Sequence, residues 1–449
     1  MKSLLRLFTS RKMTILLLLG FSSGTPLLLT KDTFKIWMAN EKVPVELIGL
    51  TSVVGLPYAL KFLWSPAMDR YVPPFLGRRR GWLLISQITL IVAIVAMAFG
   101  NPDINSRASL IVVGFFALLV AFSSASQDIV ADAYRTEALE RDEYGIGTGY
   151  FVTGYRIGLL VSGTLALILV GVLARAGETR FAFSPEYATH LSWRLVYVLM
   201  AATILVGVMT TVYAPEPRVN VRPPQTFGEA VIMPFKEFLG RNAALEILLF
   251  ISVYKLGTVA ATTMAPPFVV ELGFSREEIG AIYSGIGIAA TILGFLTGGA
   301  IIMRVGLRRS LLIFGALQGA SLLLFFFLAR QGRSRPLLIA SIAAVNLCIG
   351  MGTAAYTAFL MSLCNKRFTA TQYALFTGLM ALNLVIIGSL SGFVAKILGA
   401  GAKGAPTVSM LGWERYFLVC AACAVPGLLM LLRYKAWRVV GERESREAL

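Results

Sequence analysis

The fold is decided by residues 82–99, which read WLLISQITLIVAIVAMAF and carry no charged side chain. A helix needs roughly 20 mostly apolar residues to cross the hydrocarbon core of a bilayer. Within lipid the backbone must satisfy its own hydrogen bonds, and a helix does so inside a single segment. The stretch is therefore predicted to be a membrane-spanning helix.

Similar apolar segments recur along all 449 residues of the chain. Hydrophobic residues make up 57% of the sequence and charged residues 14%, so lipid is the expected main solvent. The segments are 13–38, 45–68, 82–99, 110–133, 145–173 and 193–213, then 243–270, 279–303, 310–328, 336–363, 371–398 and 416–432.

This pattern predicts an all-α membrane protein with twelve transmembrane helices in two pseudo-symmetric six-helix bundles. The bundles are expected at 1–214 and 243–449, joined by a cytoplasmic linker at 215–242 whose prolines break the hydrophobic pattern. Residues 226–239 of the linker are predicted to be either a short amphipathic helix on the membrane surface or a disordered connector. Residues 1–24 resemble a signal peptide, but no cleavage pattern follows, so a retained first helix is expected.

Basic residues gather in alternate short loops between the apolar segments. The side richer in Lys and Arg usually faces the cytoplasm, so both termini are predicted to be cytoplasmic. The formal net charge of +17 does not indicate a nucleic-acid partner, because the cations lie in separate turns rather than in one stripe. The denser clusters are the N-terminus, Arg70 with Arg78, Arg79 and Arg80, Arg218 with Arg222, Lys236 with Arg241, Arg304 with Arg308 and Arg309, Lys366 with Arg367, and Arg433 onward.

No cofactor and no metal ion is expected from the sequence. The four cysteines lie in or beside apolar stretches, where thiols behave as small hydrophobic groups. No Walker phosphate loop, zinc spacing or nucleophile with a matching base is recognisable, so neither ATP-driven transport nor enzymatic activity is expected. His190, the single histidine, lies in a predicted outer loop, so any proton coupling would depend on carboxylates.

A charged turn links the second and third apolar segments. It contains Asp69-Arg70 and, after residues 71–76, Gly77-Arg78-Arg79-Arg80. An acid at a helix end is able to engage the N-terminus of another helix across the two halves, while arginines pair with acids on the fourth helix. Asp69, Arg70, Arg78, Arg79 and Arg80 are therefore predicted to be gating residues, and the alternative is a plain positive-inside cluster.

The two halves also share a weak internal similarity. Glu46-Leu-Ile-Gly49 at the start of the second segment matches Glu278-Ile-Gly280 at the start of the eighth. Arginine-rich turns follow both, although Met303 replaces the acid in the second copy. Together with the charged turn, such parallel repeats resemble the major facilitator fold, whose halves enclose a central site near the bilayer midplane.

Charged side chains inside the apolar segments mark the candidate site. Each costs at least about 2.5 to 3.5 kcal/mol at the bilayer centre, so each needs a reason to be there. Asp128 and Asp132 share a helical face beside Gln127, and these two acids are predicted to couple protons. The alternative is a structural ion pair, such as Asp132 with Arg135 or Asp128 with Arg156.

Other polar residues in the spans complete the list of candidates. Lys31, Asp32 and Lys35, near the outer end of the first segment, are predicted either to gate entry or only to be solvated. For Tyr356 and Asn383, which are candidates for the wall opposite the buried charges, hydrogen bonding between helices is the alternative. The remaining charges within spans are Lys61, Arg156, Lys255 and Lys396.

Short motifs spread over nearly the whole chain carry a family resemblance. They are Gly20-Phe-Ser-Ser-Gly-Thr-Pro-Leu27, Lys61-Phe-Leu-Trp-Ser-Pro66 with Asp69-Arg70, Gly77-Arg-Arg-Arg-Gly-Trp82, Ser124-Ala-Ser-Gln-Asp-Ile-Val130 with Asp132-Ala133, Ala214-Pro-Glu-Pro217, Tyr254-Lys-Leu-Gly257, and Leu363-Cys-Asn-Lys366 with Thr371-Gln372. Together they resemble the AmpG muropeptide permease family of the major facilitator superfamily. The sequence departs from the family at Lys31-Asp32, where small polar residues are expected, and at Thr258, where an acid is expected.

The resemblance implies proton-coupled import of N-acetylglucosaminyl-1,6-anhydro-N-acetylmuramyl peptides across the bacterial inner membrane by alternating access. It further implies a role in peptidoglycan recycling and, in some bacteria, in β-lactamase induction. Asp128 matches the family position expected for proton coupling. Carboxylates of such a cargo would be held by Lys61, Arg156 and Lys255 beside Gln127, and its sugars would stack on Trp37, Tyr58, Tyr155 or Tyr356.

Two other functions stay open at this point. One is a carrier of the same fold for another anionic cargo, such as an acyl-coenzyme A or a different glycoconjugate. The other is a non-transporting membrane scaffold or pigment-binding protein, which would not need buried acids and bases along an aqueous path. The expected partners are therefore a small-molecule substrate, protons and the lipid bilayer, and a monomer is expected.

Overall fold

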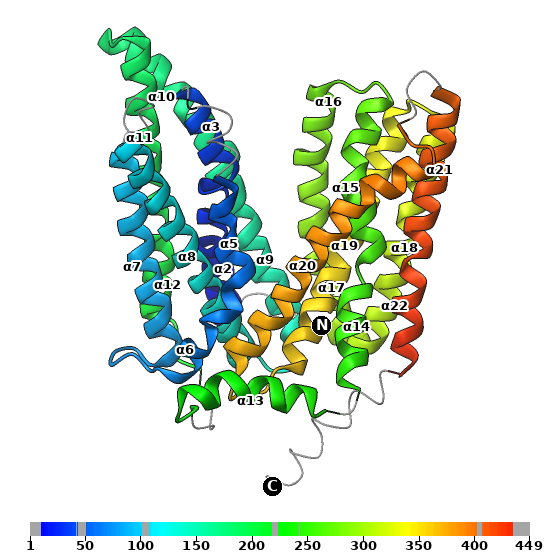
Figure 1. The fold of residues 1–449 in the computed structure, drawn as a ribbon, viewed down its shortest axis with the longest axis horizontal. Helices are drawn as coiled ribbons and strands as arrows, with labels where there is room; N and C mark the ends of the chain where they lie inside the picture. The colour runs from blue at the N-terminus through cyan, green and yellow to red at the C-terminus, as the bar shows by residue number, and fades with distance from the viewer. Residues whose placement is uncertain are drawn as a thin grey trace. The chain divides into compact units, whose positions relative to one another are not determined.

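The structure is a computed structural model that describes residues 10–41, 43, 51–100, 107–217, 223–241, 243–401 and 406–433 (Figure 1). All twelve predicted spans fall within these ranges except for residues 45–50 at the start of the second. The repeat motif Glu46-Leu-Ile-Gly49, the cations Arg218 and Arg222, and the two ends of the chain lie outside the described residues.

Eleven helices in the described residues are long and apolar enough to cross a membrane. A shorter apolar helix, Val53–Leu63, lies where the sequence predicts the second of twelve spans. The prediction of an all-α membrane fold is confirmed. The long helical spans are Arg11–Asn40, Arg78–Phe99, Ala108–Ala138, Tyr144–Phe181, Pro185–Tyr213, Ala244–Glu271, Glu278–Val305, Leu307–Gln331, Arg335–Leu363, Thr369–Ile397 and Thr407–Met430.

The helices form two compact units. Unit 1 comprises Met1–Leu139, Tyr150–Val231 and Cys364–Ala374, so a short segment from late in the chain clusters with the first half. Its helices are α2 (Arg11–Leu29), α3 (Asp32–Asn40), α5 (Leu56–Leu60), α6 (Ser65–Arg70), α7 (Arg78–Phe99), α8 (Arg107–Ala138), α10 (Ala166–Phe181), α11 (Pro185–Thr203) and α12 (Leu205–Tyr213), with the 3-10 turns η1 (Thr51–Gly55) and η2 (Lys61–Leu63).

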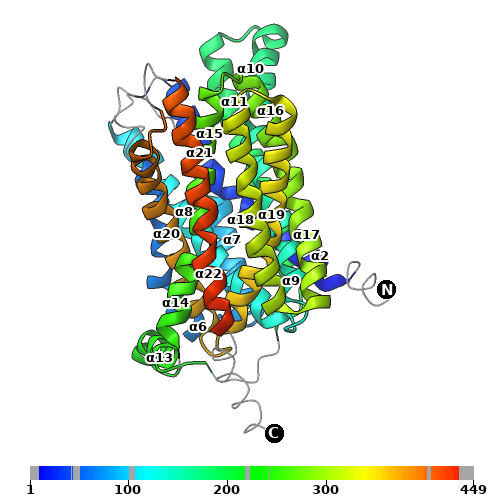
Figure 2. The ribbon, with the colours of Figure 1, turned by 90° about the vertical axis from the view of Figure 1, so that its right-hand side faces the viewer.

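Unit 2 comprises Glu140–Gly149, Ile232–Leu363 and Leu375–Leu449. Within it α17 and α18 both pack on α19, and α18 also packs on α21, as the side view in Figure 2 shows. Its helices are α14 (Ala244–Val253), α15 (Leu256–Glu271), α16 (Arg276–Ala281), α17 (Ile288–Val305), α18 (Leu307–Gln331), α19 (Arg335–Leu363), α21 (Pro406–Ala422) and α22 (Ala424–Met430), with the 3-10 turn η5 (Leu431–Arg433).

Three further helices have residues in both units: α9 (Tyr144–Leu160), α13 (Phe227–Leu239) and α20 (Thr369–Ile397). α13 forms where the sequence leaves a choice between a helix and a disordered connector. Ala230, Pro234 and Phe238 recur every fourth residue and are buried, while Ile232 and Leu239 are exposed. This spacing gives the helix one buried face and one exposed apolar face.

The first membrane span is broken into α2 and α3. Glycine and proline at Gly24-Thr25-Pro26 would favour a kink there, but α2 continues through Pro26 and the chain turns at Thr30 and Lys31. The Thr30 hydroxyl donates to the carbonyl oxygens of Pro26 and Leu27 at 3.3 and 3.2 Å. Thr30 is thus the cap of α2, which ends at Leu29, three residues beyond the proline.

The second span is also broken, and the break places a cation. Pro57 and Pro66 lie in the first turns of α5 and α6, where a missing N–H does not disturb a helix. Between these two short helices lies the 3-10 turn η2, which begins at Lys61. Lys61 is 8% exposed, so the break holds a lysine within the protein.

Two of the long spans contain a π-helical turn. One is η3 (Val161–Leu165), between α9 and α10, and the other is η4 (Ile282–Gly287), between α16 and α17. A π-turn leaves a backbone carbonyl free of the regular helical pattern. In η3 the Ser162 carbonyl accepts a hydrogen bond from the Thr33 hydroxyl at 3.0 Å, which joins this turn to α3.

Each unit has its own aromatic core. In unit 1 the Trp37 ring lies 6.1 Å from the Trp193 ring and 4.8 Å from the Tyr197 ring, measured between centroids. In unit 2 the Phe268 ring lies 5.0 Å from the Phe417 ring. These buried clusters pack α3 on α11 in unit 1 and α15 on α21 in unit 2.

Glycines allow α2 and α9 to approach closely within unit 1. Gly20 and Gly24 of α2 face the backbone of α9, and Gly154 and Gly158 of α9 face the backbone of α2. A Cβ added to Gly154 would lie 1.8 Å from the carbonyl oxygen of Leu17. Small residues spaced by four are typical of such contacts between membrane helices.

We expect Gly154→Ala to destabilise the protein by about 1 to 3 kcal/mol, because the new methyl group would overlap backbone that has no room to move. Gly114→Ala is the matched control, since a Cβ at Gly114 would meet nothing within 4 Å. Thermal unfolding of the purified variants would measure the difference. Equal stability of the two variants would contradict the close packing of α2 on α9.

Candidate functional site

Arg79, at the start of α7, is the centre of a buried ion network. Its side chain has no exposed surface. Its Nη2 donates to Asp69 Oδ1 at 2.8 Å and to Glu137 Oε1 at 2.5 Å, and its Nε donates to Glu137 Oε2 at 3.0 Å. Its Nη1 donates to the Met68 carbonyl at 3.2 Å, and Arg78 adds a contact to Glu137 at 3.1 Å. One guanidinium thus holds two carboxylates and a backbone carbonyl.

Asp69 also caps the N-terminus of α20. Its Oδ2 accepts from the Thr371 N–H at 2.8 Å and from the Thr371 hydroxyl at 2.7 Å, and its Oδ1 accepts from the Ala370 N–H at 3.2 Å. The first N–H groups of a helix lack partners within the helix, and the helix dipole favours an anion there. These contacts are of the kind that the sequence predicts for Asp69, and they attach residues 364–374 to unit 1.

Gly77 and Glu216 set the start of α7. The Glu216 carboxylate accepts from the N–H groups of Arg79 and Arg80 at 2.7 and 3.0 Å. Gly77 has φ +88°, and a Cβ on it would lie 2.8 Å from Cδ of Glu216. Only glycine suits this backbone and this close approach, so Gly77 and Glu216 together orient Arg79.

The other arginines of the turn make different contacts. Arg80 donates to the carbonyl oxygens of Thr211 and Val212, at the end of α12, at 2.9 and 2.5 Å. The Arg70 guanidinium lies over the Tyr71 ring, 4.9 Å from its centroid. No ion pair of Arg70 occurs within the described ranges. Arg79, with Arg78 beside it, therefore carries the buried network.

A second charged cluster lies between α8 and η2. Asp132 accepts from Arg135 at 2.9 Å, and its other oxygen lies 3.9 Å from Lys61 Nζ. Arg135 is 2% exposed and also donates to the Tyr373 hydroxyl at 2.7 Å. The ion pair of Asp132 with Arg135, which is one of the sequence-based alternatives, is therefore present, and Lys61 makes it a triad.

Asp128 lies one turn before Asp132 on α8. It interacts with the Ser23 side chain of α2 and with the charges of Lys61, Asp132 and Arg135. An ion pair of Asp128 with Arg156 is not found in the described part of the chain. The polar cluster therefore joins α8 to the middle of the first span.

Gln127, beside Asp128, strengthens this link to α2. Its Nε2 donates to the Ser22 and Ser23 hydroxyl oxygens at 3.1 and 3.2 Å, and its side chain has no exposed surface. A buried amide that is held in this way orients the hydroxyls around it. Gln127 is therefore placed to fix Ser23 next to Asp128.

Two tyrosines lie near Asp128. Tyr58 of α5 and Tyr155 of α9 both interact electrostatically with its carboxyl group. Lys31 lies over the Tyr58 ring, with Nζ 5.6 Å from the ring centroid. Acids, cations and aromatic rings are thus gathered in unit 1.

Three predicted residues lie at the edge of this cluster or outside it. Arg156 is half-buried and interacts with Tyr155. Asp32 is exposed and Lys35 half-buried at the start of α3. Neither has an ion pair within the described residues.

In unit 2 the predicted residues Lys255 and Tyr356 lie together. Lys255 Nζ donates to the Thr353 hydroxyl at 2.5 Å and lies 5.4 Å from the Tyr356 ring centroid. Tyr356 is fully buried, and its hydroxyl donates to the Ile251 carbonyl at 2.5 Å. Tyr356 thus bonds between helices, which is the alternative role that the sequence suggests.

Three more candidates have separate surroundings. Trp37 is 1% exposed inside the aromatic core of unit 1, and its indole N–H donates to Glu41 at 3.3 Å. Asn383 is half-buried, and its amide nitrogen has no hydrogen-bond partner within the described ranges. Lys396 is exposed. Trp37 is part of the packed core of unit 1, and Asn383 and Lys396 belong to unit 2.

Sequence reasoning did not name the residues that complete the two clusters. Glu137 is the next acid after Asp132 on α8, so the expectation that arginines pair with acids on the fourth helix could have identified it. Glu216 lies in the motif Ala214-Pro-Glu-Pro217, but nothing in its spacing indicates a contact with α7. Tyr373 is distant in sequence from Arg135, and no pattern connects them.

A multi-pass helical fold with charges held inside its spans is typical of a membrane transporter. The family model described as Major Facilitator Superfamily matches residues 13–388. The chain is 43% identical over 429 residues to the anhydromuropeptide permease of Escherichia coli (strain K12), and the match covers 95% of this chain and 80% of the relative. It is 30% identical over 437 residues to the putative transporter AmpG 4 of Rickettsia felis, which covers 95% of this chain and 97% of that relative.

Solved structures agree on the fold. The E. coli fucose:proton symporter has a TM-score of 0.64 at 14% identity, covering 92% of this chain and 98% of that chain. A bacterial homologue of the iron transporter ferroportin, in an outward-facing state, has a TM-score of 0.63 at 12% identity. The match covers 95% of this chain and 100% of that chain. At these identities the likeness shows the fold alone.

The chain therefore belongs to the major facilitator superfamily and, within it, to the AmpG family of permeases. The predicted fold class and the predicted family are both confirmed. The protein is a multi-pass membrane transporter of small molecules and not an enzyme, because its relatives and its fold are those of permeases.

We expect Arg79→Gln to lower the stability of the purified protein by about 3 to 5 kcal/mol, because it leaves Asp69 and Glu137 buried without their cation. Arg70→Gln is the control from the same turn and should change stability by less than about 0.5 kcal/mol. Thermal unfolding in detergent would measure both. A fully stable Arg79→Gln protein would show that the network is not needed for folding.

Proposed function

We propose that the protein imports anhydromuropeptides together with protons across the bacterial inner membrane, for peptidoglycan recycling. The observation that carries this proposal is the 43% identity, over 95% of the chain, to a protein named anhydromuropeptide permease. The buried acids and bases of unit 1 supply a chemical basis for it. In this proposal the protein acts as a monomer, with both termini in the cytoplasm.

The first step of the proposed cycle is recognition of the cargo. The peptide part carries carboxylates, and Lys61 is the cation beside the acid cluster that is placed to bind one of them. Tyr58 and Tyr155 are tyrosines that interact with Asp128, so we assign the sugar rings to them. Arg156 and Lys255 would bind further carboxylates, while Trp37 and Tyr356 stay in the packed cores.

The charge balance of the cluster around Asp128 couples proton uptake to cargo binding. With both carboxyl groups ionised, the charges of Asp128 and Asp132 cancel those of Lys61 and Arg135. Adding one proton to Asp128 leaves the cluster with a net positive charge, which favours binding of an anionic cargo beside Lys61. Loss of the proton on the cytoplasmic side restores the balance and favours release. Asp128 is thus the proposed proton carrier, and Asp132 holds the two cations.

The ion network at Arg79 is the proposed gate. We propose that residues 1–214 and 243–449 are the two bundles that move during transport, joined by 215–242. The contacts of Asp69 with Thr371 and Ala370 would break in one phase of the cycle and re-form in the other. Arg79 would retain Asp69 and Glu137 throughout, so no buried carboxylate is left without a cation.

Uptake into proteoliposomes with an imposed proton gradient would test the proposal. Labelled anhydromuropeptide should accumulate when the outside is acidic. An excess of unlabelled anhydromuropeptide should compete, and an acyl-coenzyme A or an unrelated glycoconjugate should not. Competition by one of these instead would establish the other anionic cargo, and absence of any flux would support a non-transporting role.

We expect Asp128→Asn to lower gradient-driven accumulation at least about tenfold, equivalent to about 1.4 kcal/mol, because the side chain no longer takes up a proton. Exchange of labelled for unlabelled cargo without a gradient should persist. Asp142→Asn, at an exposed acid outside the cluster, is the control. Accumulation at the wild-type rate in the Asp128→Asn protein would remove Asp128 from the mechanism.

We expect Lys61→Met to raise the half-saturating cargo concentration about tenfold or more, because a hydrogen bond to a charged group contributes about 1.5 to 3 kcal/mol. Lys396→Met, at an exposed lysine, is the control and should leave this concentration unchanged. Initial uptake rates over a range of cargo concentrations would measure the effect. An unchanged value for Lys61→Met would place the carboxylate site elsewhere.

A further inference from the structure

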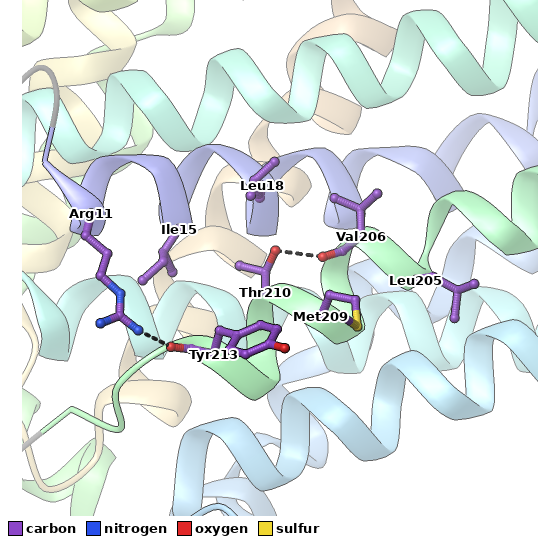
Figure 3. A pocket seen from close by; sticks show the side chains of 8 residues that line it. All are labelled: Arg11, Ile15, Leu18, Leu205, Val206, Met209, Thr210 and Tyr213. Carbon is purple, nitrogen blue, oxygen red and sulfur yellow. Dashed lines mark hydrogen bonds between the residues drawn. The ribbon is translucent and has the colours of Figure 1, made fainter.

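A groove in unit 1 lies apart from both charged clusters. It runs between α2 and α12 and has a volume of about 490 Å³ (Figure 3). Ile15 and Leu18 line it from α2, and Val206 and Met209 line it from α12. Nothing in the proposed transport cycle uses this groove.

The walls of the groove are apolar and open. Val206 is 38% exposed and Met209 is 54% exposed, and both belong to the membrane span Pro185–Tyr213. From Arg11 to Leu18 the helix α2 rises about 10 Å, at 1.5 Å per residue. In a spanning helix, exposed apolar side chains face hydrocarbon, so the walls suit an acyl chain.

One end of the groove is basic. Arg11 is exposed and donates from Nη2 to the carbonyl oxygen of Tyr213 at 2.6 Å, as the dashed line in Figure 3 shows. Lys12, the next residue, is exposed as well. Arg80 donates to the neighbouring carbonyls of Thr211 and Val212. Arg11 and Arg80 thus both bond to carbonyl oxygens in the last turn of α12.

Glu216, three residues after Tyr213, is already bound. The Glu216 carboxylate accepts from the N–H groups of Arg79 and Arg80, so it is held at the start of α7. Arg11 has five N–H donors, and within the described residues it makes one hydrogen bond, to a carbonyl. The basic end therefore has donors and positive charge for an anionic group.

We propose that this groove binds an anionic phospholipid, with the headgroup phosphate at Arg11 and an acyl chain along α2 and α12. A phosphate next to a short apolar channel matches the order of the lining residues, basic at one end and apolar beyond it. A zwitterionic lipid carries its own cation and gains less from this end. The proposal does not depend on which cargo the protein carries.

Binding here would act on the helix that holds the polar cluster. α2 carries Ser22 and Ser23, which contact Gln127 and Asp128, and it packs against α9 through glycine. A lipid between α2 and α12 therefore stabilises one position of α2. An anionic lipid is thereby a ligand with a route to the transport site.

Native mass spectrometry of the full-length protein would test the proposal. The protein would be mixed with phosphatidylglycerol and with phosphatidylcholine of the same acyl chains, and the retained lipid would be counted. Phosphatidylglycerol should be retained preferentially. Arg11→Gln should weaken its retention about fivefold, as expected for one basic residue near an anionic headgroup. Met209→Trp, which fills the groove, should weaken retention of the same lipid.

Two further variants serve as controls. Arg175→Gln is the matched control, because Arg175 is also exposed and also donates to a helical carbonyl, that of Gly171 at 3.1 Å. Arg11→Lys keeps the charge and should keep the preference for phosphatidylglycerol, so a loss in Arg11→Gln that Arg11→Lys restores cannot be misfolding. Equal retention of the two lipids by the wild-type protein would overturn the proposal. So would equal losses in Arg11→Gln and Arg175→Gln, or a dimer that Met209→Trp dissociates.

Discussion

The structure depends on the rule that a charge removed from water needs a partner of opposite charge. Arg79 shows the strictest case, because it has no exposed surface and binds Asp69 and Glu137 together. A buried cation with well-placed acids fixes geometry more than it adds stability, since desolvation offsets much of the attraction. Here the geometry brings α6, α7, α8 and the start of α20 to one place. The charged turn therefore organises unit 1.

The same rule explains the polar cluster around Asp132, with a different result. Lys61, Arg135 and the two acids of α8 balance in charge, but they are joined by longer and fewer contacts than the Arg79 network. Lys61 approaches Asp132 only to 3.9 Å, and Asp128 interacts with the charge of Lys61 and with the Ser23 hydroxyl of α2. A balanced but loosely paired set of charges responds to one added proton or one bound anion. The charges of the Arg79 network are paired tightly, which suits that network to holding helices together. The charges around Asp132 are paired loosely, which suits that cluster to a change of protonation or to binding an anion.

The sequence allows prediction of the spans, of the charged turn and of the acid face on α8, because each rests on a local pattern. It does not show that α2 continues through Pro26 and ends at Leu29, with Thr30 as its cap. It does not predict that Glu216 caps α7 or that residues 364–374 join unit 1, because these contacts link distant parts of the chain. Trp37 shows a further limit. An aromatic ring suits a sugar site and a packed core equally well, and only its burial against Trp193 and Tyr197 separates the two.

The π-turn η3 has a consequence for the evolution of the two halves. Such a turn corresponds to one residue inserted into an α-helix, and each residue turns the helix by about 100°. The fifth span of the first half contains this insertion, whereas α20, the fifth span of the second half, is a continuous α-helix. An ungapped alignment of the two repeats would therefore match side chains from different faces beyond Leu165. Any search for ancestral symmetry between the halves has to allow a single-residue gap at that point.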